Sequence, residues 1–204
     1  MKKNIFKGKV GGALCGEEMV KQLDGKGKIV ILDATPGRDV MQARVDGFKS
    51  VIEENEGIEI VAEQIANSDR AEAVTVMETI LQANAEIDGV WAANDEMALG
   101  AVEALRALGM EKDVVVGGFD ATDDAVDSVN AGEMNFTANQ IPYEIGVRAI
   151  AVSYMLAKDM EIPAEDISLP MSMISQDNVE EYLSEQKAQQ AAVIQQVMEE
   201  YGLN

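Results

Sequence analysis

Amide, carboxylate and guanidinium groups follow the apolar segments of this sequence at regular intervals. In GVWAANDEMALGAVEAL, an apolar run over 89–93 is followed by Asn94, Asp95 and Glu96, and then by strong helix formers. Such side chains can exchange hydrogen bonds with a neutral polar molecule. Capping of a helix start is the alternative for each Asn or Asp, and it is the favoured interpretation for Asp95 and Asp69.

Similar polar groups follow the other predicted strands. Arg38 and Arg44 come after the first strand, residues 67–70 after the second, Asp120 after the fourth and Gln140 after the fifth. The pattern supports capping and ligand contact equally for Asp120. Arg44 falls inside a predicted helix, where a solvated surface position is the alternative to a binding role.

Several kinds of chemistry have no support in the sequence. There is no histidine, and Cys15 is the only cysteine, so the commonest general base and thiolate metal sites are absent. No phosphate-binding GxxxxGK[ST] loop occurs, and the glycines of GKVGGALCG do not follow a strand. The sequence therefore predicts a protein that is not an enzyme and has no cofactor or metal, with Cys15 buried in the core.

Charge and hydropathy limit the partners. The formal net charge is −21, which argues against binding to nucleic acid or to an anionic membrane. No apolar run has the length of a membrane span. The start, MKKNIFKGKVGGALCG, lacks the apolar stretch and cleavage site of a signal peptide, so we expect a cytoplasmic chain or one whose true N-terminus has been removed.

The elements that position the polar groups alternate along the chain. Helices are predicted over 8–23, 39–55, 66–84, 121–131, 142–160 and 178–202, with one more after residue 93; strands are predicted over 28–34, 58–64, 89–93, 113–120 and 134–140, and the pattern allows another over 167–175. Nearly continuous Val, Ile and Ala in strands between helices are typical of a parallel sheet covered on both faces. The predicted fold class is α/β, a doubly wound, flavodoxin-like parallel sheet over 8–140. Ligands of such sheets bind outside the carboxyl ends of the strands, where the polar groups fall.

Two segments carry a family resemblance. WAANDEMALGAVEALRALG and VVVGGFDATDDAVDSVNAGEMNFTANQIPYEIG resemble the sugar-binding proteins of bacterial ABC importers of the ribose/galactose type. The similarity begins at NIFKGKVGG, extends to about residue 180 and corresponds to the C-terminal lobe of those proteins. NDEMALGA, GFD-x-T and Q-x-P in this order and spacing make it specific.

The resemblance implies one lobe of a type I periplasmic-binding-protein fold that binds a sugar or polyol without catalysis. The implied ligand-binding residues are Arg44, Asn94, Asp120 and Gln140, with Ser68 and Arg38 as further candidates. Asn94 would be the ligand-facing amide, and Asp95 and Glu96 would begin the helix and complement its dipole. A full-length parent would be a periplasmic protein or an extracellular lipoprotein that delivers its solute to an ABC permease.

This sequence departs from the family in two respects. Ribose-type proteins place an aromatic ring near the position of Ser68, whereas IANSDRAEA has none, so other polyols and small polar solutes stay open. No counterpart of the family's N-terminal lobe is present, which leaves half of the ligand cleft. The alternatives are the effector-binding core of a Lac-repressor-type regulator and a free-standing flavodoxin-like enzyme or electron carrier, for which ATPGRD is a poor phosphate loop.

The C-terminal third raises a question of assembly. We expect one lobe over 1–176 and an amphipathic helix over 177–204, with 143–165 packing on the other lobe in a full-length relative. YEIGVRAIAVSYMLAK presents Ile145, Ile150, Val152, Met155 and Leu156, too much apolar surface to leave in water. This helix could fold back on its own sheet beside the last helix, or two copies could pair through 143–158. We favour the homodimer because the sheet already has enough covering helices.

Overall fold

A computed structural model describes residues 2–83, 86–162 and 169–203. Contacts divide the chain into two compact units, one of residues 1–138 and 173–179 and the other of residues 139–172 and 180–204. This division differs from the boundary at 176/177 expected from the sequence. It assigns the helix after residue 141 and the C-terminal helix to the same unit.

The first unit is built on a sheet with the strand order β2-β1-β3-β4-β5-β6. Its strands are β1 (Gly27–Asp33), β2 (Ile58–Ile65), β3 (Gly89–Ala92), β4 (Val115–Phe119), β5 (Phe136–Asn139) and β6 (Ser172–Ser175). The pairs β1–β2, β1–β3, β3–β4 and β4–β5 are all parallel. The predicted doubly wound parallel sheet is confirmed, and its strand order reverses direction between β1 and β3, where such folds bind ligands.

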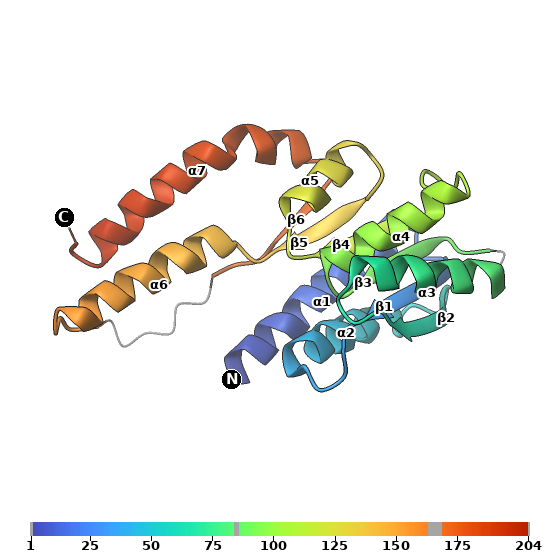
Figure 1. Ribbon diagram of the computed structural model, residues 1–204, viewed down its shortest axis with the longest axis horizontal. Coiled ribbons are helices and arrows are strands. Elements are labelled where there is room, and N and C mark those ends of the chain that lie inside the picture. Colours follow the sequence, from blue (N-terminus) through green and yellow to red (C-terminus); the bar gives the residue numbers. More distant parts are fainter. Residues whose placement is uncertain (1, 84–85, 163–168, 204) are drawn as a thin grey trace. The chain divides into compact units, whose positions relative to one another are not determined.

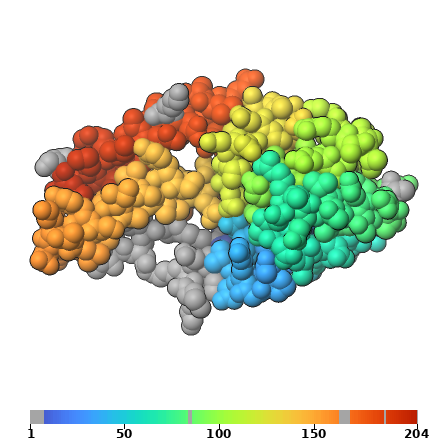
Figure 2. All heavy atoms as spheres, in the orientation of Figure 1, coloured from blue at the N-terminus to red at the C-terminus, as the bar shows by residue number. Residues whose placement is uncertain are grey.

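Helices cover both faces of this sheet. They are α1 (Lys2–Gln22), α2 (Asp39–Ile52), α3 (Arg70–Ala83), α4 (Asp95–Ala107) and α5 (Asp123–Asn130). α1 and α2 lie on one face, and α3, α4 and α5 lie on the other (Figure 1). In the space-filling view, the atoms of α3, α4 and α5 form a continuous surface on the face that they cover (Figure 2). The core includes Trp91 of β3, whose ring stacks on Phe48 of α2 at 4.1 Å between centroids.

Glycines bring α1 and α2 unusually close together. A Cβ atom on Gly12 would overlap the carbonyl oxygen of Arg44, and one on Gly47 would overlap the carbonyl oxygen of Lys9. Only hydrogen fits at these two positions, so the helix backbones can touch. This contact involves the backbone of Arg44 itself, so it fixes the position of Arg44 along α1.

Most predicted elements are present with shorter bounds. The helix predicted over 66–84 begins at Arg70, because Asn67 and Ser68 have φ angles of 53° and 60° that no right-handed helix contains. Asp69 accepts a hydrogen bond from the backbone N–H of Glu72 at 2.9 Å, which confirms its predicted capping role. The strand allowed over 167–175 is observed as β6, and residues 167–168 lie outside the described part of the chain.

The second unit contains two helices, α6 (Pro142–Ala157) and α7 (Val179–Glu200). Ala151 and Met155 of α6 pack against Val197 and Tyr201, at and just beyond the end of α7. Arg148 is 9% exposed and donates hydrogen bonds to Glu144 and Glu200. One side of α6 is therefore covered from within the chain.

The other side of α6 remains apolar and exposed. Ile145, Ile150, Tyr154 and Leu156 have exposed fractions of 46%, 73%, 51% and 59%. The expectation that Met155 belongs to this exposed surface is wrong, because α7 covers it and leaves it 3% exposed. Val152 is also not fully exposed, since it packs against the same cluster and is half-buried. Among the helices of the described ranges, none is long and apolar enough to cross a membrane.

Candidate functional site

Arg44 and Asp120 meet at the carboxyl edge of the sheet. Arg44 Nη2 donates to Asp120 Oδ1 at 2.9 Å, and Arg44 Nη1 donates to the carbonyl oxygen of Ala93 at 2.7 Å. The guanidinium lies over the ring of Phe119, 3.9 Å from its centroid. Arg44 is only 6% exposed, so the alternative of a solvated surface arginine is wrong. The sheet, the aromatic ring and the carboxylate hold this cation rigidly in place.

Asp120 occupies an unusual backbone conformation directly after β4. Its φ angle is 120°, and that of Ala121 is 54°, both outside the range that L-amino acids prefer. Its backbone N–H donates to the carbonyl oxygen of Ala138 at 2.9 Å. The side chain is 32% exposed, whereas that of its partner Arg44 is 7% exposed. The carboxylate is thus bound by Arg44 and remains partly exposed to solvent.

Asn94 caps α4. Its Oδ1 accepts from the backbone N–H of Met97 at 3.1 Å, and its backbone is extended, as at other N-caps. Asn94 directly follows Ala93, whose carbonyl oxygen binds Arg44. The amide oxygen is therefore committed to the helix, and the amide nitrogen is the group that Asn94 can offer to a ligand.

Asp95 does not cap its own helix, and this part of the prediction is wrong. Its side chain is fully buried, with Oδ1 accepting from Thr137 Oγ1 at 2.7 Å and Oδ2 accepting from the backbone N–H of Thr122 at 2.8 Å. Burial raises the pKa of this carboxyl from 3.8 to about 6, although hydrogen bonds from Thr137 and Thr122 act in the opposite direction. The sequence does not predict the hydrogen bond between Thr137 and Asp95, because it joins residues that are 42 positions apart.

The remaining predicted site residues are Ser68, Arg38 and Gln140. Ser68 follows β2, and its Oγ is buried without a hydrogen-bond partner among the described residues. Arg38 is exposed at the start of α2 and makes no side-chain capping bond. Gln140 follows β5 and belongs to the second unit, so its role in the site stays a prediction.

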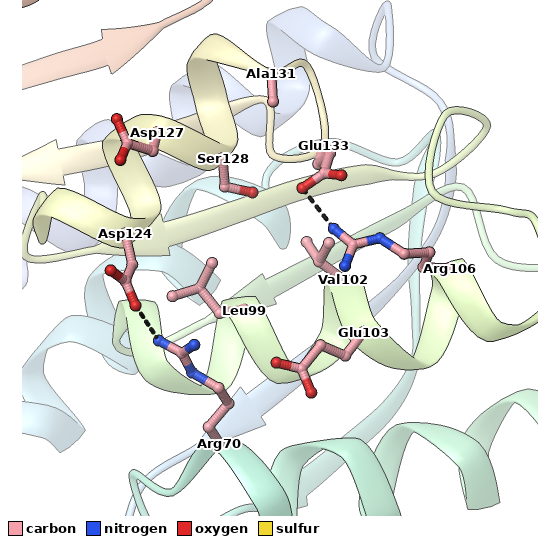
Figure 3. A pocket seen from close by; sticks show the side chains of 10 residues that line it. All are labelled: Arg70, Leu99, Val102, Glu103, Arg106, Asp124, Asp127, Ser128, Ala131 and Glu133. Atoms are coloured by element: carbon pink, nitrogen blue, oxygen red, sulfur yellow. Dashed lines mark hydrogen bonds and ion pairs between the residues drawn. The ribbon is translucent and has the colours of Figure 1, made fainter.

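A separate groove of about 400 Å³ lies between α4 and α5 (Figure 3). Leu99, Val102 and Ala131 give it apolar walls, and two ion pairs cross it, Arg70–Asp124 and Arg106–Glu133. None of the predicted site residues lines it. Because both of its arginines already pair with carboxylates, the groove is better explained as a junction between helices than as a solute site.

Cys15 lies in the core, as predicted. Its side chain is fully buried, its Sγ is 3.7 Å from the carbonyl oxygen of Gly118, and burial raises the pKa of the thiol to about 12. A thiol in this protonated state is a poor nucleophile. Within the described ranges, no group of three or more acidic, Cys or His side chains is arranged to hold a metal ion.

The sheet topology and the polar groups at its carboxyl edge define a lobe of the type I periplasmic-binding-protein fold. The family model described as "Periplasmic binding protein domain" matches residues 6–161, so this chain belongs to that family. The resemblance inferred from the sequence motifs is therefore confirmed.

Individual relatives agree with this assignment. The ribose import binding protein of Haemophilus influenzae is 32% identical over 166 residues, which cover 81% of this chain and 56% of that protein. An ABC transporter periplasmic solute-binding protein from Actinobacillus succinogenes with bound D-allose is 32% identical with a TM-score of 0.81. An ABC transporter solute-binding protein from Bacillus halodurans with bound myo-inositol is 38% identical with the same TM-score. In both structural matches, 86% of this chain and 61% of the other are covered.

The chain thus spans little more than half the length of these relatives. These relatives are solute-binding components of ABC importers, and their family is one of periplasmic binding proteins. The similarity therefore supports a solute-binding protein over the two alternatives, a transcription regulator and a flavodoxin-like domain. At the same level, the family is one of binding proteins rather than enzymes.

Proposed function

We propose that this chain is one solute-binding lobe of an ABC-importer binding protein and that it binds a neutral sugar or polyol without catalysing a reaction. The observation that carries the proposal is the Arg44–Asp120 pair, which is anchored in the protein and faces solvent at the carboxyl edge of the sheet. Arg44, Asn94 and Asp120 are the proposed ligand contacts, with Gln140 as a fourth.

The chemistry of these groups suits adjacent hydroxyls. A carboxylate accepts hydrogen bonds only, and guanidinium and amide nitrogens donate them. A sugar or cyclitol offers neighbouring hydroxyl groups that can do both, so one hydroxyl can donate to Asp120 while the next accepts from Arg44 or Asn94. The charges of Arg44 and Asp120 cancel, which favours a neutral ligand over an ion.

The relatives and the residues around Ser68 indicate which kind of solute fits this site. The relatives described above bind ribose, D-allose and myo-inositol, which share rings carrying vicinal hydroxyls. The segment IANSDRAEA around Ser68 offers no aromatic ring to stack on an apolar sugar face. A hydroxyl-rich ligand that depends less on stacking fits this site best, and Ser68 and Arg38 are candidate supporting contacts.

The partners follow from the same proposal. A second lobe would close over the ligand, and an ABC permease would receive it outside the cytoplasmic membrane. The charge of −21 disfavours nucleic acid as a partner. A parent protein of this kind would be periplasmic or an extracellular lipoprotein.

We further propose that two copies of the chain pair through residues 143–158. Support comes from the exposed apolar side of α6, formed by Ile145, Ile150, Tyr154 and Leu156. An apolar surface of this kind usually marks an interface. Light scattering over a tenfold concentration range tests the pairing, and Ile150→Glu should shift the mass to that of a monomer. A mass of 22 kDa at every concentration would contradict it.

Saturation-transfer difference NMR on the 204-residue chain tests the binding function. Ribose, D-allose and myo-inositol are offered together with betaine, a small polar solute that has no hydroxyl group. We expect transfer to at least one of the three polyols, none to betaine, and loss of the signal in Asp120→Asn. Equal transfer to all four solutes, or transfer that Asp120→Asn leaves unchanged, would count against the proposed site.

A further inference from the structure

The turn that carries Asp120 is held by a buried hydrogen-bond chain. Asp120, Ala121 and Thr122 follow β4, and all three backbone N–H groups have partners. Asp120 donates to the carbonyl oxygen of Ala138 at 2.9 Å, Ala121 donates to Thr137 Oγ1 at 3.1 Å, and Thr122 donates to Asp95 Oδ2 at 2.8 Å. Two of these three partners are side chains.

Those two side chains are bonded to each other. Thr137 Oγ1 donates to Asp95 Oδ1 at 2.7 Å, and both residues are completely buried. A hydroxyl has one proton, so while Thr137 gives it to Asp95, its lone pairs are free to accept from Ala121. The carboxylate of Asp95 therefore sets the direction of the whole chain.

The turn needs this support. Asp120 and Ala121 have φ angles of 120° and 54°, and neither is glycine. Side-chain-bearing residues keep such conformations only where the surrounding structure forces them. The outcome of the conformation is that Asp120 Oδ1 lies 2.9 Å from Arg44 Nη2.

We infer that Asp95 is a positioning residue for the ligand site: acting with Thr137, it holds the 120–122 turn in the conformation that directs Asp120 toward Arg44. This role rests on the proposed function only in that Asp120 is taken to contact the solute. Asp95 itself faces the protein interior and does not contact the ligand.

A carboxylate is required because both neighbours donate to it. In Asp95→Asn, one of the two donors, Thr137 Oγ1 or the N–H of Thr122, would face an amide NH₂ that cannot accept. Gly118 belongs to the same arrangement, since a Cβ atom there would overlap Asp95 Oδ1. The space beside β4 is thus reserved for this carboxylate.

Two pairs of variants test the inference. Thr137→Ser keeps the hydroxyl, and Thr137→Val keeps the shape but removes it; Asp95→Asn is compared with Asp127→Asn on the exposed side of α5. Amide ¹H–¹⁵N spectra of the 204-residue chain report the turn, and D-allose, ribose and myo-inositol titrations report binding. Circular dichroism confirms that each variant is folded, and Thr137→Val provides the test if Asp95→Asn does not fold.

We expect large amide shifts at Asp120, Ala121 and Thr122 in Thr137→Val and Asp95→Asn, and near-parental positions in Thr137→Ser and Asp127→Asn. Affinity for whichever of the three solutes binds should fall about tenfold in the first two variants and stay within about twofold in the others. Unchanged turn amides in both Thr137→Val and Asp95→Asn would overturn the positioning role, whatever the solutes do. Displaced turn amides without solute binding to the parent chain would uphold the positioning of Asp120 and refute the binding function instead.

Discussion

Arg44 Nη2 and Asp120 Oδ1 lie 2.9 Å apart although the two residues are 76 positions apart in the sequence. The two side chains differ in exposure, 7% for Arg44 and 32% for Asp120. Arg44 is also held by the carbonyl oxygen of Ala93 and by the ring of Phe119. Arg44 is therefore the more firmly held member of the pair, and Asp120 is the more exposed one.

Asp120→Asn should destabilise the first unit, because it leaves the buried Arg44 guanidinium without its anionic partner. The expected loss in the free energy of unfolding is about 1–3 kcal/mol. Urea unfolding followed by the fluorescence of Trp91, the only tryptophan and fully buried in β3, measures it. Asp127→Asn removes an exposed carboxylate from α5 and serves as the control. Equal stability of the two variants would show that the ion pair contributes nothing.

Gly12→Ala should push α1 away from α2, because the added methyl group would overlap the carbonyl oxygen of Arg44. We expect a loss of about 1–3 kcal/mol in the Trp91 unfolding transition. Gly146→Ala is the matched control: it lies in α6, in the second unit, with nothing within 4 Å of its added Cβ. In Gly146→Ala, the midpoint of the urea unfolding transition reported by Trp91 should be the same as in the parent protein. A Gly12→Ala protein as stable as the parent would argue against the close helix contact.

The buried carboxyl of Asp95 should make stability depend on pH. Its pKa is raised from 3.8 to about 6 by burial, so the folded state binds this proton more tightly than the unfolded state. The Asp95 contribution to stability is therefore greatest below about pH 4 and falls as the pH rises through about 6. The difference in unfolding free energy between the parent and Asp95→Asn isolates this contribution, because other carboxyls largely cancel. A difference that grows in the parent's favour between about pH 4 and 7 would contradict the assignment.

Cys15 should resist thiol reagents for as long as the protein is folded. The side chain is completely buried, and the pKa of its thiol is raised to about 12, so little thiolate is present near neutral pH. Labelling with iodoacetamide at about pH 8 should be slow in buffer and rapid in denaturing urea. Rapid labelling of the native protein would show that α1 opens readily from the sheet.

The sequence predicted the sheet well because each strand is a short, continuous run of apolar residues between helices. Asp120 could be placed at the carboxyl edge because it follows an apolar strand, and the family resemblance added Arg44; the structure brings the two side chains together, and their role in binding stays a prediction. The sequence did not reveal why Asp95 is buried, because the partner Thr137 is 42 residues away and nothing local marks the pairing. The close contact of α1 with α2 was missed for the same reason, since Gly12 and Gly47 acquire meaning only when the helices cross.

Affinity offers a further prediction. One lobe supplies about half of the contacts that a closed two-lobed site would make, while association still costs translational and rotational freedom. We expect this chain to bind its solute weakly, with a Kd in the millimolar range. Calorimetry that gives a micromolar or tighter Kd for a monosaccharide would contradict this, and would point to a complete site formed by the chain alone or by two copies.

The most direct test of the central claim is a ¹H–¹⁵N titration of the 204-residue chain with ribose, D-allose and myo-inositol, read residue by residue. We expect at least one of these solutes to shift the amides of Ala93, Asn94, Asp120 and Ala121, and the amides of Ala131 and Glu133 in the α4–α5 groove to stay in place. Shifts confined to that groove, or no shifts with any of the three solutes, would contradict a binding site built on Arg44 and Asp120.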